Sequence, residues 1–263
     1  MLPLELLNRV ACFETLRAYE GKIFCLRKHL ERLSDSCIGL GRCLPSTPLE
    51  LERWVLATLK ESSFPDARLR LSVHWQDKEE GILLLMIWEF KNHPKVWYEK
   101  GVKLAATAVK RWNPRAQDPQ IKSSMFVSGV LAISNQGKNE AHELIFLTQE
   151  GNVSEGTVSN IFIVKERRLL TPAVSSGILR GVTRGAVIEL AGKRGLEVKE
   201  TPLLRHDIYN AEECFITNTS SEILPVISVD DRLIADGRPG PVTKGLAKDF
   251  KVYVRRTLGK KSK

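Results

Sequence analysis

The chain has 263 residues, of which 43% are hydrophobic and 27% charged, and its formal net charge is +9. These values are ordinary for a globular protein that buries a sizeable core in one large domain or two smaller ones. The longest apolar run, Ile82 to Trp88, suits a buried strand and is too short to cross a membrane. The composition therefore argues against a disordered chain and against a membrane-spanning protein.

The basic balance raises the question of a nucleic-acid partner. Much of the excess charge lies in the tail from Lys251 to Lys263, while elsewhere bases and acids are mixed. No aromatic residues are interleaved with the bases as they are in single-strand binders. We therefore expect a solvated tail, no nucleic-acid partner and a field that suits anionic small molecules. The first residues lack the pattern of a secretory signal, which predicts a cytoplasmic protein.

Cysteine and histidine usage points away from disulfides and metals. The five cysteines form an odd number with no CxxC pair, which disfavours both a disulfide framework and a zinc site. The five histidines are scattered at spacings that suggest no metal ligation. We expect reduced thiols and no metal.

The first 110 residues predict a hairpin, two helices and three strands. In chain order these are the hairpin 11–26, the helices 26–40 and 48–60, and the strands 67–75, 82–90 and 102–109. Helices between antiparallel strands indicate an α+β domain over residues 1–110. Residues 111–120, RWNPRAQDPQ, hold two prolines and no periodicity, which is typical of a linker. A second domain would then occupy residues 121–263.

The second domain opens with a lysine in an unusual place. Lys122 begins a predicted helix, although cations prefer the other helix end. It is either a surface lysine or a reactive amine, and the pKa of a lysine falls when the group is buried or lies near other positive charge. The remaining predicted elements are the strands 144–148, 161–164, 197–201, 214–217 and 223–229 and the helices 182–194 and 241–254.

Two loops of this domain carry groups that suit an anion. Gly177 and Gly181 precede the helix that starts at Val182, and a helix N-terminus after glycines offers free N–H groups and a positive dipole end to a phosphate. Thr183 adds a hydroxyl, and the loop NTSSE after residue 217 supplies further small donors. An ordinary loop-to-helix junction is the alternative for the glycines alone. A lone acid, Glu155, stands where the strand at residue 161 begins.

An amine, a lone carboxylate and phosphate donors are what pyridoxal 5'-phosphate requires. The motifs also resemble, in order, those of the class IV aminotransferases, the fold type IV group of pyridoxal-phosphate enzymes. They are FETLR (13–17), HLERL (29–33), IKSS (121–124), EGTVSNIF (155–162), GILRGVTR (177–184), TNTSSEILPV (217–226) and GPVTKGL (240–246). Seven motifs in the right order are much more specific than any one of them.

The resemblance implies a role for individual residues. Lys122 would form the Schiff base with the cofactor, Glu155 would pair with the ring nitrogen, and Leu179 would pack on the ring face. The residues assigned to the cofactor are Arg32, Lys122, Glu155, Leu179, Val182, Thr183 and Thr219, and those assigned to the substrate are Phe13 and Ser220. Ser220 would offer its backbone N–H to the substrate carboxylate. A carboxylate close to the ring favours the protonated ring, which is the better electron sink.

The resemblance also implies the fold and the assembly. It predicts a D-amino acid aminotransferase-like fold, with an N-terminal α/β sandwich, a C-terminal pseudo-barrel and the cofactor between them. Family members are at least homodimers. The chain departs from the family's pattern in two places. Asn8 and Arg9 stand where an aromatic-glycine step is usual, and Phe126 or Val127 replaces a tyrosine often found after the lysine. The first departure concerns the substrate pocket, and the second concerns a hydroxyl near the cofactor's O3'.

The function that the resemblance favours is transamination between a branched-chain-like amino acid and a 2-oxo acid through Lys122. One alternative is an aminodeoxychorismate lyase, in which the same lysine starts an elimination of pyruvate that gives 4-aminobenzoate. Another is a D-amino acid aminotransferase, because members specific for L- and D-amino acids share these cofactor motifs. A relative that keeps the fold without catalysis is the alternative from a different class.

Overall fold

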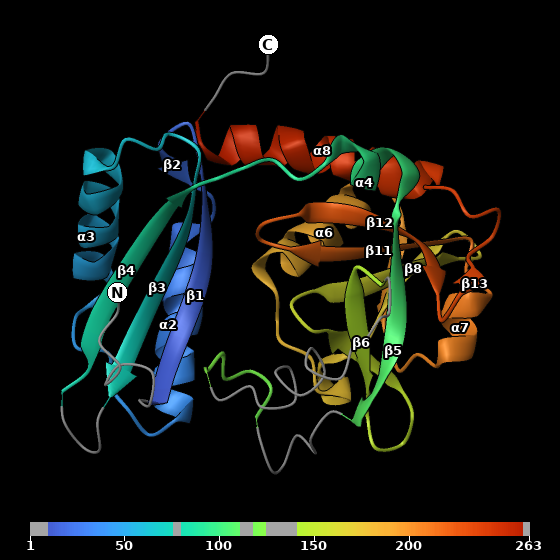
Figure 1. The fold of residues 1–263 in the computed structure, drawn as a ribbon, viewed down its shortest axis with the longest axis horizontal. Helices are drawn as coiled ribbons and strands as arrows, with labels where there is room; N and C mark the ends of the chain where they lie inside the picture. The colour runs from blue at the N-terminus through green and yellow to red at the C-terminus, as the bar shows by residue number, and fades with distance from the viewer. Residues whose placement is uncertain (1–9, 76–79, 111–117, 125–140, 260–263) are drawn as a thin grey trace. The chain divides into compact units, whose positions relative to one another are not determined.

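The computed structural model describes residues 10–75, 80–110, 118–124 and 141–259 (Figure 1). The chain forms two compact units. The first comprises residues 1–92, 120–126 and 255–263, and the second comprises residues 93–119 and 127–254.

The first unit is a four-stranded antiparallel sheet with two helices on one face (Figure 1). Its strand order is β2-β1-β3-β4. The strands are β1 (Val10–Tyr19), β2 (Lys22–Ile23), β3 (Ala67–Trp75) and β4 (Ile82–Glu89), and the helices are α2 (Leu26–Gly39) and α3 (Pro48–Glu61). The predicted hairpin, both helices and the strands at 67 and 82 are confirmed. Helix α3 begins with a capping box between Thr47 and Glu50, which explains its sharp start at Pro48.

Alternation along the strands divides the sheet into two faces. On β3, Leu69 and Leu71 are buried in the core, while Arg68 is exposed and Arg70 is half-buried on the other face. Leu16 of β1 pairs with Leu69, and Glu14 pairs with Leu71. The alternation therefore places the Glu14 carboxylate on the face of β1 that packs against the helices.

The second unit is built on a nine-stranded mixed sheet. Its path is β10-β9-β8-β11-β12-β5-β6-β7, with β13 paired to β12, and it curves into a half-barrel. The strands are β5 (Val102–Lys110), β6 (Glu143–Leu147), β7 (Val153–Gly156), β8 (Asn160–Lys165), β9 (Arg168–Thr171), β10 (Glu197–Glu200), β11 (Glu213–Asn218), β12 (Glu222–Val229) and β13 (Arg232–Leu233). The helices are α4 (Lys95–Lys100), the 3₁₀ turn η1 (Val174–Ser176), α6 (Val182–Lys193), α7 (Arg205–Tyr209) and α8 (Pro241–Thr257).

Strand β8 is apolar at consecutive positions because both of its faces are covered. Ile161 and Ile163 belong to one hydrophobic cluster. On the opposite face, Phe162 stacks on Phe215 of β11 with ring centroids 5.0 Å apart. The mixed α+β class and the pseudo-barrel that the sequence predicts are confirmed.

The structure differs from the sequence-based expectations at several short elements. Glu155 does not lie at the start of the strand β8 but inside β7, a separate short strand before it. The strand β9 and the helices α4 and α7 were not anticipated either. The predicted helix start at Lys122 is wrong, because residues 121–124 are not helical and Ser123 forms a β-bridge with Cys12. The rest of that predicted helix lies outside the described residues. Strand β5, predicted for the first domain, pairs with β12 and β6 of the second unit.

Two further expectations concern thiols and membranes. All five cysteines fall within the described ranges, and each is a free thiol, with Cys12, Cys37 and Cys214 buried. The helices in these ranges all fall short of the length or apolar character needed to span a membrane.

Candidate active site

A buried carboxylate organises the candidate site residues of the first unit. Glu14 is fully buried, and its two oxygens accept hydrogen bonds from Arg32 Nε and Nη2, both at 2.7 Å. His29 Nδ1 lies 2.7 Å from the same carboxylate. His29 and Arg32 are three residues apart on α2, so they project from the same helix face. The HLERL motif therefore brings a histidine and an arginine onto the acid of the FETLR motif.

The charges of this cluster follow from burial and pairing. Burial alone would raise the pKa of the Glu14 carboxyl, but Arg32 and His29 outweigh it and lower that pKa to about 2. Burial lowers the pKa of His29 in spite of its bond to Glu14. An ionised Glu14 can only accept, so a neutral His29 donates its Nδ1–H to it. The two-pronged bond from Arg32 fixes the plane of the guanidinium.

Lys122 lies on a short segment that is held against β1. Its carbonyl accepts from the Phe13 N–H at 3.0 Å, and its own N–H donates to Ser36 Oγ at 3.1 Å. Ile121 packs against Gly39, where an added Cβ would lie 2.8 Å from the isoleucine side chain. Strand β1 and helix α2 therefore fix the backbone of Lys122 on both sides.

Two cations of the first unit share one aromatic ring. Lys122 Nζ lies 4.9 Å from the centroid of the Phe13 ring, and the guanidinium carbon of Arg70 lies 3.6 Å from it. Burial lowers the pKa of Arg70, which still remains a cation at neutral pH. This face of the sheet thus presents an amine, a guanidinium and an apolar ring together.

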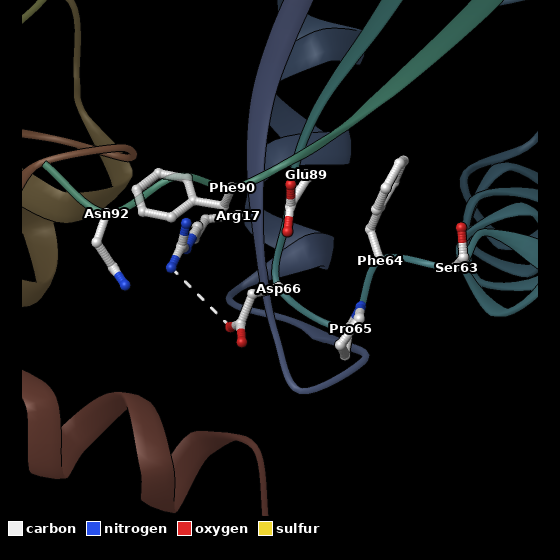
Figure 2. A pocket seen from close by; sticks show the side chains of 8 residues that line it. All are labelled: Arg17, Ser63, Phe64, Pro65, Asp66, Glu89, Phe90 and Asn92. Carbon is white, nitrogen blue, oxygen red and sulfur yellow. Dashed lines mark ion pairs between the residues drawn. The ribbon is translucent and has the colours of Figure 1, made fainter.

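A pocket of about 250 Å³ lies near the C-terminal end of β1 (Figure 2). It is lined by Arg17, Ser63, Phe64, Pro65, Asp66, Glu89, Phe90 and Asn92. The guanidinium of Arg17 stacks on Phe90 at 2.9 Å from the ring centroid and faces the Asp66 carboxylate at 4.0 Å. Because this pocket holds two carboxylates and one arginine, it does not favour an anion, and we do not assign the substrate to it.

In the second unit, two donors orient the predicted ring partner. Glu155 is buried, with 6% of its surface exposed. Its Oε2 accepts from the Leu179 N–H at 2.9 Å and from Asn160 Nδ2 at 3.2 Å. Both donors bind the same oxygen of the Glu155 carboxylate and fix the orientation of the group.

The two predicted anion loops have different local structures. Helix α6 begins after Gly181 with no side-chain hydrogen bond capping its start, and Thr183 is buried in its first turn. Its first N–H groups therefore suit an anionic ligand. In the other loop, Asn218 Oδ1 accepts from the Ser220 N–H at 2.9 Å and from the Ser221 N–H at 2.7 Å.

The structure thus groups the predicted residues within each unit. Phe13, Arg32 and Lys122 gather around β1 in the first unit. In the second unit, β11 leads into the Thr219 loop and is paired at Thr217 with Asn160, the residue that contacts Glu155. The Ser220 N–H, expected to bind substrate, donates to Asn218 instead. Asn8, Arg9, Phe126 and Val127 lie outside the described residues.

Several residues of these groups were not singled out from the sequence, among them Glu14, Arg70 and Asn160. A signal for Glu14 was present, because period-two alternation puts it on the face of Leu16, and a charge there requires partners. Asn160 immediately precedes an apolar run that predicts a buried strand. A side-chain amide buried at such a position needs hydrogen-bond partners. Arg70 carried no signal, because stacking on Phe13 depends on strand pairing.

Comparison with known proteins places the chain among aminotransferases. Residues 11–229 match the model of a family described as Amino-transferase class IV. A "Putative branched-chain-amino-acid aminotransferase" of Methanocaldococcus jannaschii is 38% identical over 249 residues, which cover 91% of this chain and 85% of that protein. A D-alanine aminotransferase of Bacillus licheniformis is 29% identical over 252 residues, covering 89% and 84%. The crystal structure of a T.th. branched-chain amino acid aminotransferase with pyridoxamine 5'-phosphate superposes with a TM-score of 0.87 at 26% identity, covering 96% of this chain and 86% of that chain.

The buried Glu14 cluster predicts a specific dependence of stability on pH. The Glu14 pKa falls from its ordinary value of 4.5 to about 2 on folding, so the cluster stabilises the fold fully above about pH 4.5 and loses this contribution as the pH falls towards 2. The difference corresponds to roughly 3 kcal/mol. In urea unfolding at pH 6 and pH 3, Glu14→Gln should lower the free energy of unfolding more at pH 6 than at pH 3.

Glu52→Gln is the matched control, because Glu52 pairs with Arg27 at the surface of the same unit. Surface pairs contribute about 0–1 kcal/mol. An equal loss for Glu14→Gln at both pH values would contradict the assignment of an ionised Glu14.

Proposed function

The chain belongs to the class IV aminotransferases, enzymes that use pyridoxal 5'-phosphate, and we propose that it moves the amino group of a branched-chain amino acid to a 2-oxo acid. The position of Lys122 carries the proposal. Its backbone is bound to β1 and α2, and its amine lies 4.9 Å from the centroid of Phe13, a ring that Arg70 also contacts. An amine, an anion-binding cation and an apolar surface are the groups that an apolar amino acid requires.

The residues of the second unit fit the cofactor. Glu155 would hold the ring nitrogen, since two donors already orient its carboxylate. The start of α6, with Val182 and Thr183, would bind the phosphate together with Thr219, and Leu179 would cover the ring. Arg32 would add a cation to the phosphate, with its guanidinium plane fixed by Glu14. When bound, the cofactor supplies an aldehyde that takes up amino groups and a ring that accepts electrons.

Lys122 would be both the attachment point and the proton carrier. Its Nζ would remove the proton from the substrate Cα and later return a proton to complete the exchange of the amino group. General-base action by a positioned group contributes roughly 10² to 10⁴ in rate.

Arg70 would also bind the substrate carboxylate. Amino acids and 2-oxo acids both carry a carboxylate, and a guanidinium pairs with it through two parallel hydrogen bonds. Phe13, whose ring both Arg70 and the Lys122 amine approach, would be an apolar contact for the substrate side chain. This arrangement favours an aliphatic amino acid over a polar one.

Assembly and location complete the proposal. We infer a homodimer, as the family resemblance implies. Ile82 and Trp88 on β4, the last strand in the sheet order of the first unit, are 45% and 40% exposed, and such apolar surface favours association. The free thiols, Cys43 at the surface among them, support a cytoplasmic location.

Lys122→Ala should abolish turnover and the visible absorbance that arises when the cofactor is linked to a lysine. Lys28→Ala is the control, because Lys28 is an exposed lysine of α2 in the same unit. Absorbance spectra and an aminotransferase assay measure the two effects. Turnover retained in Lys122→Ala would overturn the catalytic assignment.

A panel of L- and D-amino acids tests the substrate. We expect L-leucine, L-isoleucine and L-valine to convert the bound cofactor to its amine form without a 2-oxo acid, seen as loss of the visible band. Conversion by D-alanine alone would favour the D-amino acid alternative. No conversion by any amino acid, together with pyruvate release from aminodeoxychorismate, would favour the lyase.

Arg70→Gln should raise the KM for amino acids and 2-oxo acids by roughly 10- to 100-fold, because a charged hydrogen bond to the substrate is lost. Arg70→Lys should recover part of this loss, since the charge is kept. The control is Arg68→Gln, which changes an exposed arginine two residues away on the same strand and face. Steady-state kinetics give the KM, and an unchanged value in Arg70→Gln would contradict this role.

A further inference from the structure

Asn160, the first residue of β8, is a buried amide that the proposed function does not use. Its Nδ2 donates to Glu155 Oε2 at 3.2 Å and to the Leu179 carbonyl at 2.9 Å. The Leu179 N–H also donates to Glu155 Oε2, at 2.9 Å. The three residues therefore form a closed ring of hydrogen bonds that joins β7, β8 and the segment before α6.

The other end of the same amide contacts the start of α6. A Cβ added to Gly181 would lie 2.1 Å from Asn160 Oδ1, far inside contact distance. Gly181 is the residue that precedes the first turn of α6. A side chain at position 181 would therefore displace the Asn160 amide or the helix start.

The backbone of Asn160 reaches the second anion loop. It pairs with Thr217 of β11, and the next residue, Asn218, closes the turn that contains Thr219. Asn160 is thus tied to the ring partner Glu155, to the helix start at Gly181 and to the strand that leads to Thr219. A buried asparagine needs hydrogen bonds for its own stability, but that need does not require partners on three segments of one site.

We propose that Asn160 is a positioning residue, which fixes the Glu155 carboxylate relative to the N-terminus of α6 so that the ring and the phosphate of the cofactor bind as one rigid unit. This inference rests on the proposed cofactor site. Its physical basis is preorganisation. When Glu155 and the start of α6 are already held in fixed positions, the cofactor does not have to order them as it binds, and less binding free energy is lost.

The test uses the cofactor-free enzyme and measures binding, not turnover. The probes are pyridoxal 5'-phosphate, pyridoxal without the phosphate, and inorganic phosphate as a competitor, followed by fluorescence. Glu155→Gln should weaken pyridoxal and leave phosphate unchanged, and Thr183→Ala should weaken phosphate and leave pyridoxal unchanged. Asn160→Ala should weaken both, and should weaken pyridoxal 5'-phosphate by roughly 10- to 100-fold.

Gly181→Ala is a second variant, which disturbs the contact between Asn160 and the start of α6 by a change at the helix. Because the new methyl group would overlap Asn160 Oδ1, it should weaken both probes as Asn160→Ala does. The double variant should be weakened less than the two single losses combined, since the overlap is then removed. Gly185→Ala is the matched control, because a Cβ at that position of α6 meets nothing within 4 Å.

The outcomes separate this inference from the proposed function. If the unaltered enzyme binds no pyridoxal 5'-phosphate, the proposed function fails. If it binds the cofactor and Glu155→Gln weakens pyridoxal, while Asn160→Ala and Gly181→Ala both bind within twofold of the unaltered enzyme, the positioning role is overturned. Thermal unfolding of each variant identifies misfolding, and a folded Gly181→Ala protein keeps the test decisive if Asn160→Ala does not fold.

Discussion

The ionised carboxylate of Glu14 inside the first unit is the constraint on which that unit depends. A charge without exposed surface is costly unless it is paired and hydrogen-bonded, and Arg32 and His29 meet this requirement from one face of α2. Ser36, one turn further along α2, accepts the Lys122 N–H. The pairing that fixes the rotation of α2 against β1 therefore also sets the position of the lysine backbone.

The second unit holds its buried carboxylates by a different means. Glu143 accepts from the Val158 N–H at 2.7 Å, and Glu213 accepts from the N–H groups of Val242 and Thr243 where α8 begins. Burial raises the pKa of Glu143, and hydrogen bonds from the Val158 N–H and from the Ser159 and Thr157 hydroxyls counteract this only in part. Close approach of backbone to carboxylate requires small residues, and a Cβ at Gly156 or Gly240 would lie within about 2.2 Å of these acids. Backbone N–H groups, together with the hydroxyls of Thr157 and Ser159 at Glu143, thus take the place that Arg32 has in the first unit.

The sequence predicted the helices and strands that have a clear periodic pattern of apolar residues. Helices α2 and α3 and strand β3 carry full periodic patterns and appear close to the predicted bounds. Strands β7 and β9 have four residues each, which is too short for a period to stand out from the flanking loops. The cluster of Glu14 was not predicted, because the contacts of an acid on β1 with α2 depend on how strand and helix pack.

The same distinction between local signals and long-range contacts applies to the candidate site residues. The motif around Lys122 was found from the sequence, but its predicted helix was not, since tertiary contacts outweighed local preference over residues 121–124. The segment instead forms backbone hydrogen bonds with Phe13 and Ala11 of β1, and Ile121 packs against Gly39 at the end of α2. A helix start would place Lys122 at the positive end of a helix dipole, whereas the segment that forms lies against β1 with the Lys122 amine 4.9 Å from the centroid of the Phe13 ring. The position of the Lys122 amine therefore depends on the residues of β1 and α2 that hold this segment, which could not be identified from the local sequence around residue 122.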